Sequence, residues 1–283
     1  MSSLQPSSVW HDFPLELQDE IFECAAREST EAAAMLVQVS SGVGKRILPI
    51  LYQTVVFKDE WLGDVQTRFD PPHIEKWSEN EDTTLQRFEI YGCYITSLAI
   101  KPQWWKVIES CISLKNLYIP GKSPSKMLFT IHNCLPDLER LSWTFRGVQS
   151  SSDTISNNGL CEKLTHLHLV EDHSWEVVST ILTCLRGLTH LAVDDSWFEG
   201  EDSNEIVREA LKVCPGLQVV LLVWRKSDLS EICKEEVYEP RDRKVVAVAV
   251  RSVLEDWLAG VHGELDMWSL ADSIIKQRKI CEI

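Results

Sequence analysis

Three histidines and an aspartate are the side chains in this chain that most suggest chemistry. His166 and His168 alternate along one strand-like stretch, and His190 and Asp194 lie in the next. Imidazole and carboxylate groups are zinc ligands, so the trio with Asp194 as a fourth ligand could hold zinc. The sequence names no second group that would orient the imidazoles. We therefore predict no metal site and interpret these residues as part of a surface that contacts a protein partner.

Motifs of nucleotide binding and hydrolysis are incomplete or missing. Pro120-Gly121-Lys122-Ser123 ends like a phosphate-binding loop, but Asn116 stands where the first glycine of that motif is needed. The sequence has no Gly-x-Ser-x-Gly, and spacing alone assigns no Cys/His pair as nucleophile and base. We expect neither a cofactor nor enzymatic activity.

The nine cysteines include no Cys-x-x-Cys pair, so they give no support for tetrahedral zinc. Five of them stand three or four residues before a recurring leucine motif, at Cys111, Cys134, Cys161, Cys184 and Cys214. A thiol that recurs at one position of a repeat is a packing residue. We interpret these cysteines as reduced core side chains.

That motif is Leu-x-x-Leu-x-apolar, and its spacing organises most of the chain. It starts at Leu114, Leu138, Leu164, Leu188 and Leu217, with an earlier copy at Ile95. The starts lie 19 to 29 residues apart, close to the period of a leucine-rich repeat. Helix-like segments precede most copies, at 104–111, 126–134, 175–185 and 204–213. The pattern predicts an α/β solenoid of parallel strands and helices over residues 93–237.

Alternation along each strand predicts two faces. If the second leucine of each motif points into the core, the opposite, concave face carries polar side chains. We predict that a protein substrate contacts seven of them, namely Asn116, Tyr118, Arg140, His166, His168, His190 and Asp194. Val219, Leu221 and Val223 share this face, so we expect the C-terminal segment to cover its apolar end. That segment reads as a strand over 244–250 and an amphipathic helix over 266–279 that could cap the solenoid.

Charge limits the class of partner. Lys and Arg number 28 and Asp and Glu 43, which gives a net charge of −15 and argues against nucleic-acid binding. Acidic residues follow the repeat strands, at Glu171, Asp172, Asp194, Asp195, Glu199, Glu201 and Asp202. One interpretation of these acids is a solvated edge of the solenoid. The more specific interpretation is an acidic rim that steers a basic partner.

The N-terminal residues form a different unit. Apolar spacing predicts helices over 13–26, 29–39 and 43–51, which are too short to bury much core alone. The stretch Phe13-Pro14-Leu15-Glu16-Leu17 with Ile21-Phe22 resembles the opening of an F-box, and residues 36–40 and 49–56 resemble its later parts. The tail, with Asp256-Trp257, Asp266, Trp268 and Asp272, resembles a C-terminal segment of fungal F-box-like leucine-rich-repeat proteins.

The resemblance implies a substrate-recognition adaptor of a cullin–RING (SCF-type) ubiquitin ligase. In that family the F-box docks on a Skp-type adaptor protein and the repeats bind the substrate. The implied adaptor contacts are Phe13, Pro14, Leu17, Ile21, Leu36 and Val39. The alternative is a non-catalytic leucine-rich-repeat scaffold without ligase association, which the unusual Ser41-Gly42-Val43 favours.

These interpretations divide the chain into four parts. An F-box-like module spans 12–57, an acidic connector 58–92, the solenoid 93–237 and a C-terminal strand and helix cap 238–283. Within the connector, Leu85 to Tyr91 reads as an irregular first strand. The sequence shows no secretory signal and no apolar run of membrane-spanning length, so we expect no membrane partner and a cytoplasmic or nuclear protein.

Overall fold

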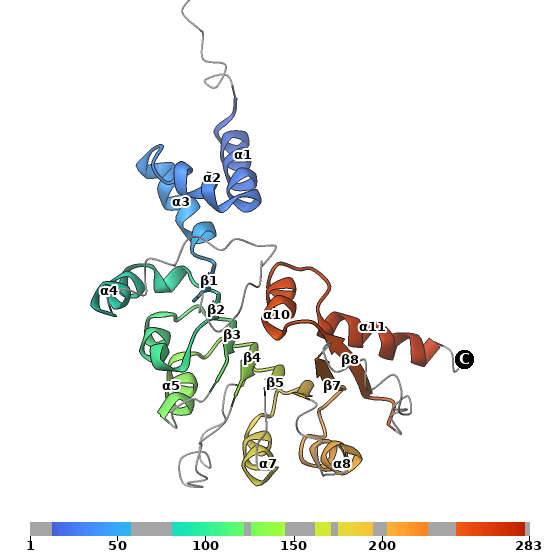
Figure 1. Ribbon diagram of the computed structural model, residues 1–283. Helices are drawn as coiled ribbons and strands as arrows, with labels where there is room; N and C mark the ends of the chain where they lie inside the picture. Colours follow the sequence, from blue (N-terminus) through green and yellow to red (C-terminus); the bar gives the residue numbers. More distant parts are fainter. Residues whose placement is uncertain are drawn as a thin grey trace, which may run out of the picture.

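An eight-stranded, all-parallel sheet forms the centre of this α/β protein (Figure 1). The computed structural model describes residues 13–57, 81–121, 126–144, 162–170, 175–194, 203–225 and 242–280. The strands stand in the sheet in the order in which they occur in the chain. They are β1 Thr54–Val56, β2 Ser97–Ala99, β3 Asn116–Ile119, β4 Arg140–Trp143, β5 His166–Leu169, β6 His190–Asp194, β7 Val219–Arg225 and β8 Val245–Val250.

The recurring leucine motif sets the register of this sheet. The second leucine of each motif pairs directly with that of the next, from Leu117 through Leu141 and Leu167 to Leu191. Leu98 of β2 and Val220 of β7 extend the same row. All six side chains are buried in one core cluster. The predicted parallel strands and their inward leucines are therefore confirmed.

Helices cover both faces of the sheet. One face carries α4 Glu81–Tyr91, the 3₁₀ segments η3 Gly92–Tyr94 and η4 Pro102–Ser110, α5 Lys126–Cys134, α7 Trp175–Cys184 and α8 Ser203–Val213. The other face lies under α10 Val253–Val261 and α11 Met267–Ile280 (Figure 1). Three N-terminal helices, α1 Leu15–Glu28, α2 Thr30–Leu36 and α3 Ser41–Leu51, precede β1. Helices occur at each place predicted in the repeats and in the N-terminal unit. The one predicted over 104–111 is the 3₁₀ helix η4, and the one predicted over 29–39 ends at Leu36.

The prediction that the cysteines before the strands are core side chains is confirmed for two of the four described ones, whereas Cys134 and Cys184 are half-buried. Cys111 and Cys214 are buried, and their Sγ atoms lie 3.3 Å from the Val107 carbonyl oxygen and 3.0 Å from that of Leu182. Burial raises the pKa of the Cys111 thiol to about 12, so the thiol stays protonated and unreactive. Cys161, predicted to play the same part, lies outside the described residues.

The prediction of an irregular strand over Leu85 to Tyr91 is wrong, because these residues belong to α4. Phe88 is buried three residues after Leu85, and it stacks on Phe57 with ring centroids 5.7 Å apart. The Tyr91 ring stacks on Tyr52, with centroids 4.4 Å apart. This helical spacing was overlooked because the surrounding residues are polar. The sheet also begins earlier than expected, at β1.

Gly92 marks a close approach between two backbone segments, and it generates a stability prediction. A Cβ atom at Gly92 would lie 2.5 Å from the Ser110 carbonyl oxygen, which a rigid backbone cannot accommodate. We expect Gly92→Ala to lower the free energy of unfolding by about 1–3 kcal/mol. At Gly42 in α3 the nearest atom, Ser40 Oγ, is 3.9 Å away. Gly42→Ala should therefore stabilise the helix by up to about 1 kcal/mol, and equal effects in urea denaturation would contradict this account.

Candidate functional site

The face of the sheet predicted to bind a substrate is covered by the C-terminal segment. At the β1–β3 end, Leu254, Trp257 and Leu258 of α10 pack on Val56, Ala99 and Tyr118. At the β6–β8 end, α11 packs on the apolar side chains of β7 and β8 through Met267, Trp268, Ala271 and Ile275. The expectation that this segment covers Val219, Leu221 and Val223 is confirmed. The C-terminal segment covers more of the sheet than predicted, because the helix α10 was not anticipated.

The seven residues predicted to contact a substrate lie on the expected face, but this cover removes most of their surface. His168 and Asp194 are fully buried, and Tyr118 and His190 keep only 6% and 8% of their surface exposed. Asn116, Arg140 and His166 are half-buried. The prediction of an open recognition face is therefore corrected, since strand alternation selects a face but does not say what packs on it.

His168 forms the centre of a buried polar chain across three strands. Its Nε2 atom lies 2.9 Å from Asp194 Oδ1, and its Nδ1 atom lies 3.3 Å from Ser142 Oγ. Both ring nitrogens thus have partners, as buried polar groups require. Asp194 belongs to this interior chain and not to an acidic rim. The other predicted rim residues, Glu171, Asp172, Asp195, Glu199, Glu201 and Asp202, lie outside the described residues.

His166 and His190 form a second, stacked pair. Their ring centroids are 4.1 Å apart, and the Trp268 ring meets both edge-on. His190 Nε2 lies 3.1 Å from Asp272 Oδ1 of α11, so the pair ties that helix to the sheet. Burial, followed by the charges of His190 and Arg140, lowers the pKa of His166 to about 3. His166 is therefore neutral at physiological pH.

A second polar tie joins the sheet to the start of α11. Arg140 Nη1 lies 3.1 Å from Asp266 Oδ2, and Asp266 Oδ1 accepts a hydrogen bond from the Ser269 amide. A small recess beside this pair is lined by Asn116, Arg140, Leu141, Ser142, His166, Trp257, Val261, Asp266 and Trp268. No group of three metal-binding side chains occurs among the described residues. The arrangement thus orders α10 and α11 against the sheet.

Sequence reasoning missed the groups that anchor the cover. Asp256, Asp266 and Asp272 were noticed only as part of a recurring tail pattern, without a role. Asp256 Oδ1 accepts the Met267 amide at 2.9 Å, so it joins α10 to the first residue of α11. The spacing of these acids relative to Trp257 and Trp268 was the available signal. The partners of Asp266 and Asp272, however, are Arg140 and His190, which belong to strands far away in the sequence.

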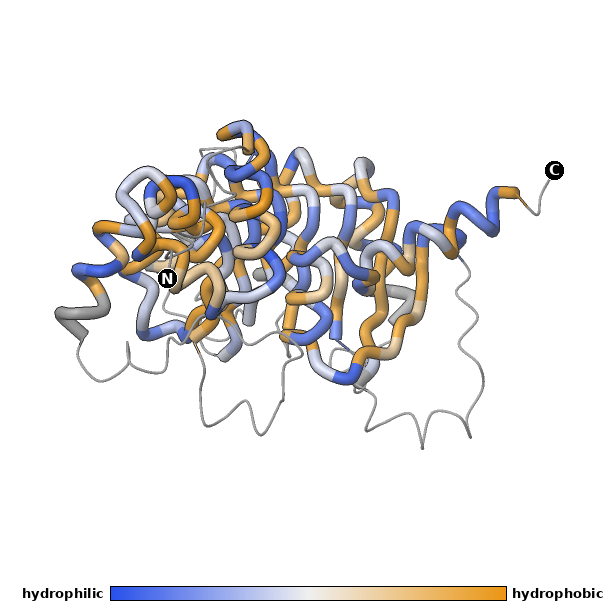
Figure 2. The backbone as a smooth tube through the Cα atoms, turned by 90° about the horizontal axis from the view of Figure 1, so that it is seen from above, coloured by the Kyte–Doolittle hydropathy of each residue, from blue (hydrophilic) through white to orange (hydrophobic). Residues whose placement is uncertain are grey.

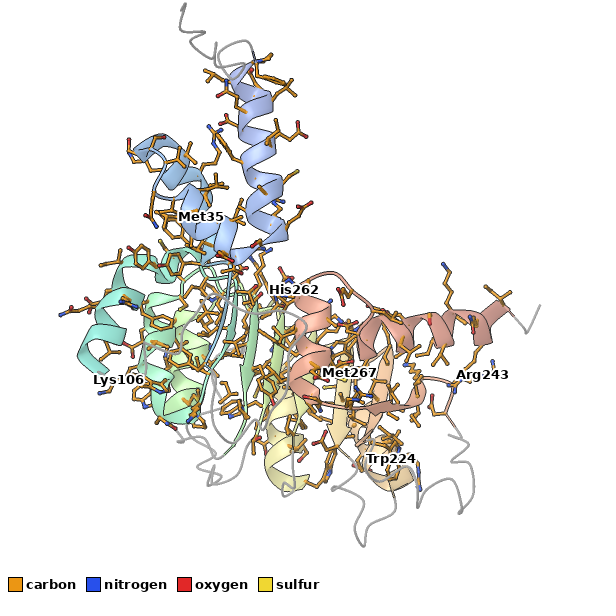
Figure 3. All side chains as sticks on the ribbon, turned by 45° about the horizontal axis from the view of Figure 1, so that its top comes forward. Met35, Lys106, Trp224, Arg243, His262 and Met267 are labelled. Atoms are coloured by element: carbon orange, nitrogen blue, oxygen red, sulfur yellow. The ribbon has the colours of Figure 1, made fainter. Side chains whose placement is uncertain are left out.

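Exposed hydrophobic side chains are concentrated on the N-terminal helices and in the residues that flank them. Among the described residues, six of the ten exposed large hydrophobic side chains lie there, at Phe13, Leu15, Leu17, Ile21, Met35 and Val39. Four of these, Phe13, Leu17, Ile21 and Val39, belong to the predicted adaptor contacts. We call the six residues the N-terminal apolar surface; Met35 is labelled in Figure 3.

The two other predicted adaptor contacts differ in their surroundings. Leu36 is half-buried against the small core of Ala26, Ala33 and Ile47. Pro14 is exposed and stands at the position just before α1, where a missing amide hydrogen is harmless. Leu36 therefore holds the three helices together, and Pro14 shapes the start of α1 beside Phe13 and Leu17.

Comparison with protein-family models and with curated proteins gives no match to this chain. In the part of the chain that the structure describes, no helix has the length and apolar character needed to cross a membrane.

The buried chain at His168 predicts the effect of removing its central ring. We expect His168→Ala to lower the free energy of unfolding by about 3–5 kcal/mol, because it leaves the Asp194 carboxylate buried without its imidazole partner. Adding Asp194→Asn to His168→Ala should restore part of the loss, because the second change removes the buried carboxylate that has lost its bond to the imidazole. Chemical denaturation of both variants checks this, and a double variant less stable than the single one would contradict it.

Asp256 predicts a pH-dependent effect. Burial, followed by the neighbouring Asp266, raises the pKa of Asp256 from 3.8 to about 6. The folded protein thus favours the protonated form of Asp256. The contribution of this group to the free energy of unfolding is fully present below pH 4 and is lost as the pH rises through 6. Asp256→Asn keeps an oxygen for the Met267 amide and removes the charge. We expect it to gain stability relative to the parent between pH 4 and 7, by at most about 3 kcal/mol.

Thermal unfolding measured from pH 4 to 8 checks this expectation. Glu264→Gln is the matched control, because Glu264 is an exposed acid in the same segment. A stability difference for Asp256→Asn that stays constant over this pH range would show that the buried charge is not its cause.

Proposed function

We propose that this protein is a non-catalytic substrate-recognition subunit of a cullin–RING ubiquitin ligase. Its N-terminal helices would act as an F-box-like module that docks a Skp-type adaptor, and its sheet and outer helices as leucine-rich repeats. The observation that carries this proposal is the N-terminal apolar surface. The resemblance of Phe13-Pro14-Leu15-Glu16-Leu17 to an F-box opening supports the choice of partner.

The N-terminal apolar surface has the composition of a protein-binding site. Leu17 and Ile21 are four residues apart in α1, so they lie on the same side of the helix and remain 45% and 43% exposed. The core beneath is small: its buried hydrophobic side chains in the three helices are Ala26, Ala33 and Ile47. Clustered exposed hydrophobic side chains mark interaction surfaces in folded proteins. A partner that covers them would also stabilise the helices.

The connection between these helices and the sheet supports a positioning role. The Gln53 carbonyl oxygen, at the end of α3, accepts hydrogen bonds from the amides of Thr96 and Ser97, both at 3.0 Å. The stacked Tyr52 and Tyr91 rings lie beside this junction. A protein bound to α1 would therefore be held in a defined position relative to the sheet. Positioning without catalysis is what a ligase adaptor requires.

A scaffold without ligase association is the second candidate. The feature that favours it is the first turn of α3, where Ser41 and Gly42 are exposed and present neither charge nor a large apolar group. In this alternative the N-terminal apolar surface would bind another protein. The two candidates differ in whether a Skp-type adaptor binds.

Co-purification with a Skp-type adaptor tests the proposal. We expect the intact chain to retain the adaptor, and Leu17→Asp or Ile21→Asp to reduce its affinity by roughly a hundredfold, because each places a charge in an apolar contact. Ile112→Asp is the matched control, since Ile112 is an exposed hydrophobic residue outside the module, at 59%.

The outcomes separate the two candidates. Normal adaptor binding by Ile112→Asp and loss of binding by the α1 variants would support docking through α1. Failure of the intact chain to bind any Skp-type adaptor, while circular dichroism shows it folded, would favour the scaffold.

A further inference from the structure

We propose that the outer edge of β8 binds an extended, acidic peptide segment of a partner protein by adding it to the sheet as a further strand. The argument rests on the backbone of β8, on the small side chains at its edge and on the charges around it. As the recognition surface of a ligase subunit this site would deepen the proposed function, but peptide binding itself requires no adaptor.

The hydrogen-bond pattern shows which groups of β8 point outward. The Val220 amide donates to the Lys244 carbonyl oxygen at 2.8 Å, and Val220 pairs in register with Val245. In a parallel ladder this directs the amide and carbonyl groups of Val246 and Val248 to β7. Those of Val245, Ala247 and Ala249 then point to the outer edge.

Only the first of these outward carbonyls has a partner among the described residues. Arg278 Nη1 of α11 donates to the Val245 carbonyl oxygen at 2.7 Å, which agrees with its outward direction. No strand in the described part of the chain pairs with the outer edge of β8. Ala247 and Ala249 therefore each offer one amide donor and one carbonyl acceptor to an added strand.

The side chains leave room for such a strand. Val246, Val248 and Val250 are buried beneath α11, which supports one face of β8. On the opposite face Ala247 and Ala249 are exposed, and their methyl groups are too small to shield the backbone. Exposed strand edges are usually blocked by long charged side chains or proline. Neither occurs at these two positions.

Among the described residues, β8 with its flanking positions and the C-terminal half of α11 carry a charge opposite in sign to that of the whole protein. The segments 242–251 and 273–280 contain six basic residues and one acid, Asp242, in a chain of net charge −15. The bases are Arg243, Lys244, Arg251, Lys276, Arg278 and Lys279. Arg243 lies beside the C-terminal half of α11 (Figure 3), where its carbonyl oxygen accepts from Arg278. The hydrophilic end of α11 extends beyond the rest of the protein (Figure 2).

These charges select the partner. Arg251, Lys276 and Lys279 are exposed. Arg251 directly follows β8, and the two lysines belong to α11, which packs on β8. A strand that carries carboxylates would gain attraction from them at close range, whereas a basic strand would be repelled. The edge thus fits an extended segment with acidic side chains, held by backbone hydrogen bonds and oriented by charge.

The test uses the full chain and an acetylated peptide of alternating Glu and Val as the probe. We expect saturable binding by isothermal titration calorimetry, and binding at least roughly tenfold weaker for the matching peptide of Lys and Val. A Glu and Val peptide that is N-methylated along one edge keeps its charge but cannot donate to β8. Its affinity should also be lower by at least roughly tenfold.

Two variants of the protein locate the site. Ala249→Pro removes an outward amide that β7 does not use, so the sheet should remain folded while peptide affinity falls. Lys276→Glu with Lys279→Glu should weaken binding and reduce its dependence on salt. Ile112→Asp, at a distant exposed site, should bind normally.

Three results would overturn the proposal. Absence of binding to the intact chain would mean that the edge is closed by the chain itself or by a second copy. Equal binding of the N-methylated peptide would show attraction by charge alone. Equal binding of the Lys and Val peptide would show that the site does not prefer acidic segments. None of these results bears on adaptor docking, which is measured separately.

Discussion

An all-parallel sheet must bury both of its faces, and this constraint governs the rest of the structure. The described helices between the strands, from α4 to α8, lie on one face and enclose the row from Leu98 to Val220. Within the described residues, the other face is covered by helices that follow the last strand. It is apolar at β7 and β8 and polar at β4 and β5, so it needs a cover that matches both parts.

The C-terminal segment supplies that cover in two chemically different ways. Over β7 and β8 the contact is apolar, through Met267, Ala271 and Ile275. Near the middle strands it is made by polar ties, in which Arg140 binds Asp266 and His190 binds Asp272. Hydrophobic burial supplies most of the free energy that holds the C-terminal segment on the sheet. The polar ties define where the segment lies, because each buried polar group needs one specific partner.

The two binding surfaces proposed here lie away from the closed sheet face, at the ends of the sheet. The N-terminal apolar surface precedes β1, and the outer edge of β8 ends the sheet, so the two lie at opposite ends of the strand order (Figure 1). One end offers exposed hydrophobic side chains, and the other offers backbone groups and positive charge. Such a separation allows two proteins to be held at once without competing for the same surface.

Local patterns determined much of this structure. The repeated Leu-x-x-Leu motif was sufficient to locate β2 to β7, their register and the face that each side chain occupies, because strand alternation and repeat spacing are properties of neighbouring residues. Leu17 and Ile21, which are exposed in α1, had been singled out only through the resemblance to an F-box, and Leu15 had not. Leu85 to Tyr91 was misjudged because Phe88 and Tyr91 find their aromatic partners, Phe57 and Tyr52, more than thirty residues away.

The sequence by itself thus determined the strands, the core row and which histidines share a face. Only the tertiary structure decided whether that face is open. The burial of His168 and the pairing of His190 with Asp272 depend on a segment that follows β6 by some sixty residues or more. Periodicity describes one element and its neighbours, whereas the fit of α10 and α11 on the sheet depends on packing and buried polar pairs between distant segments, which spacing does not encode.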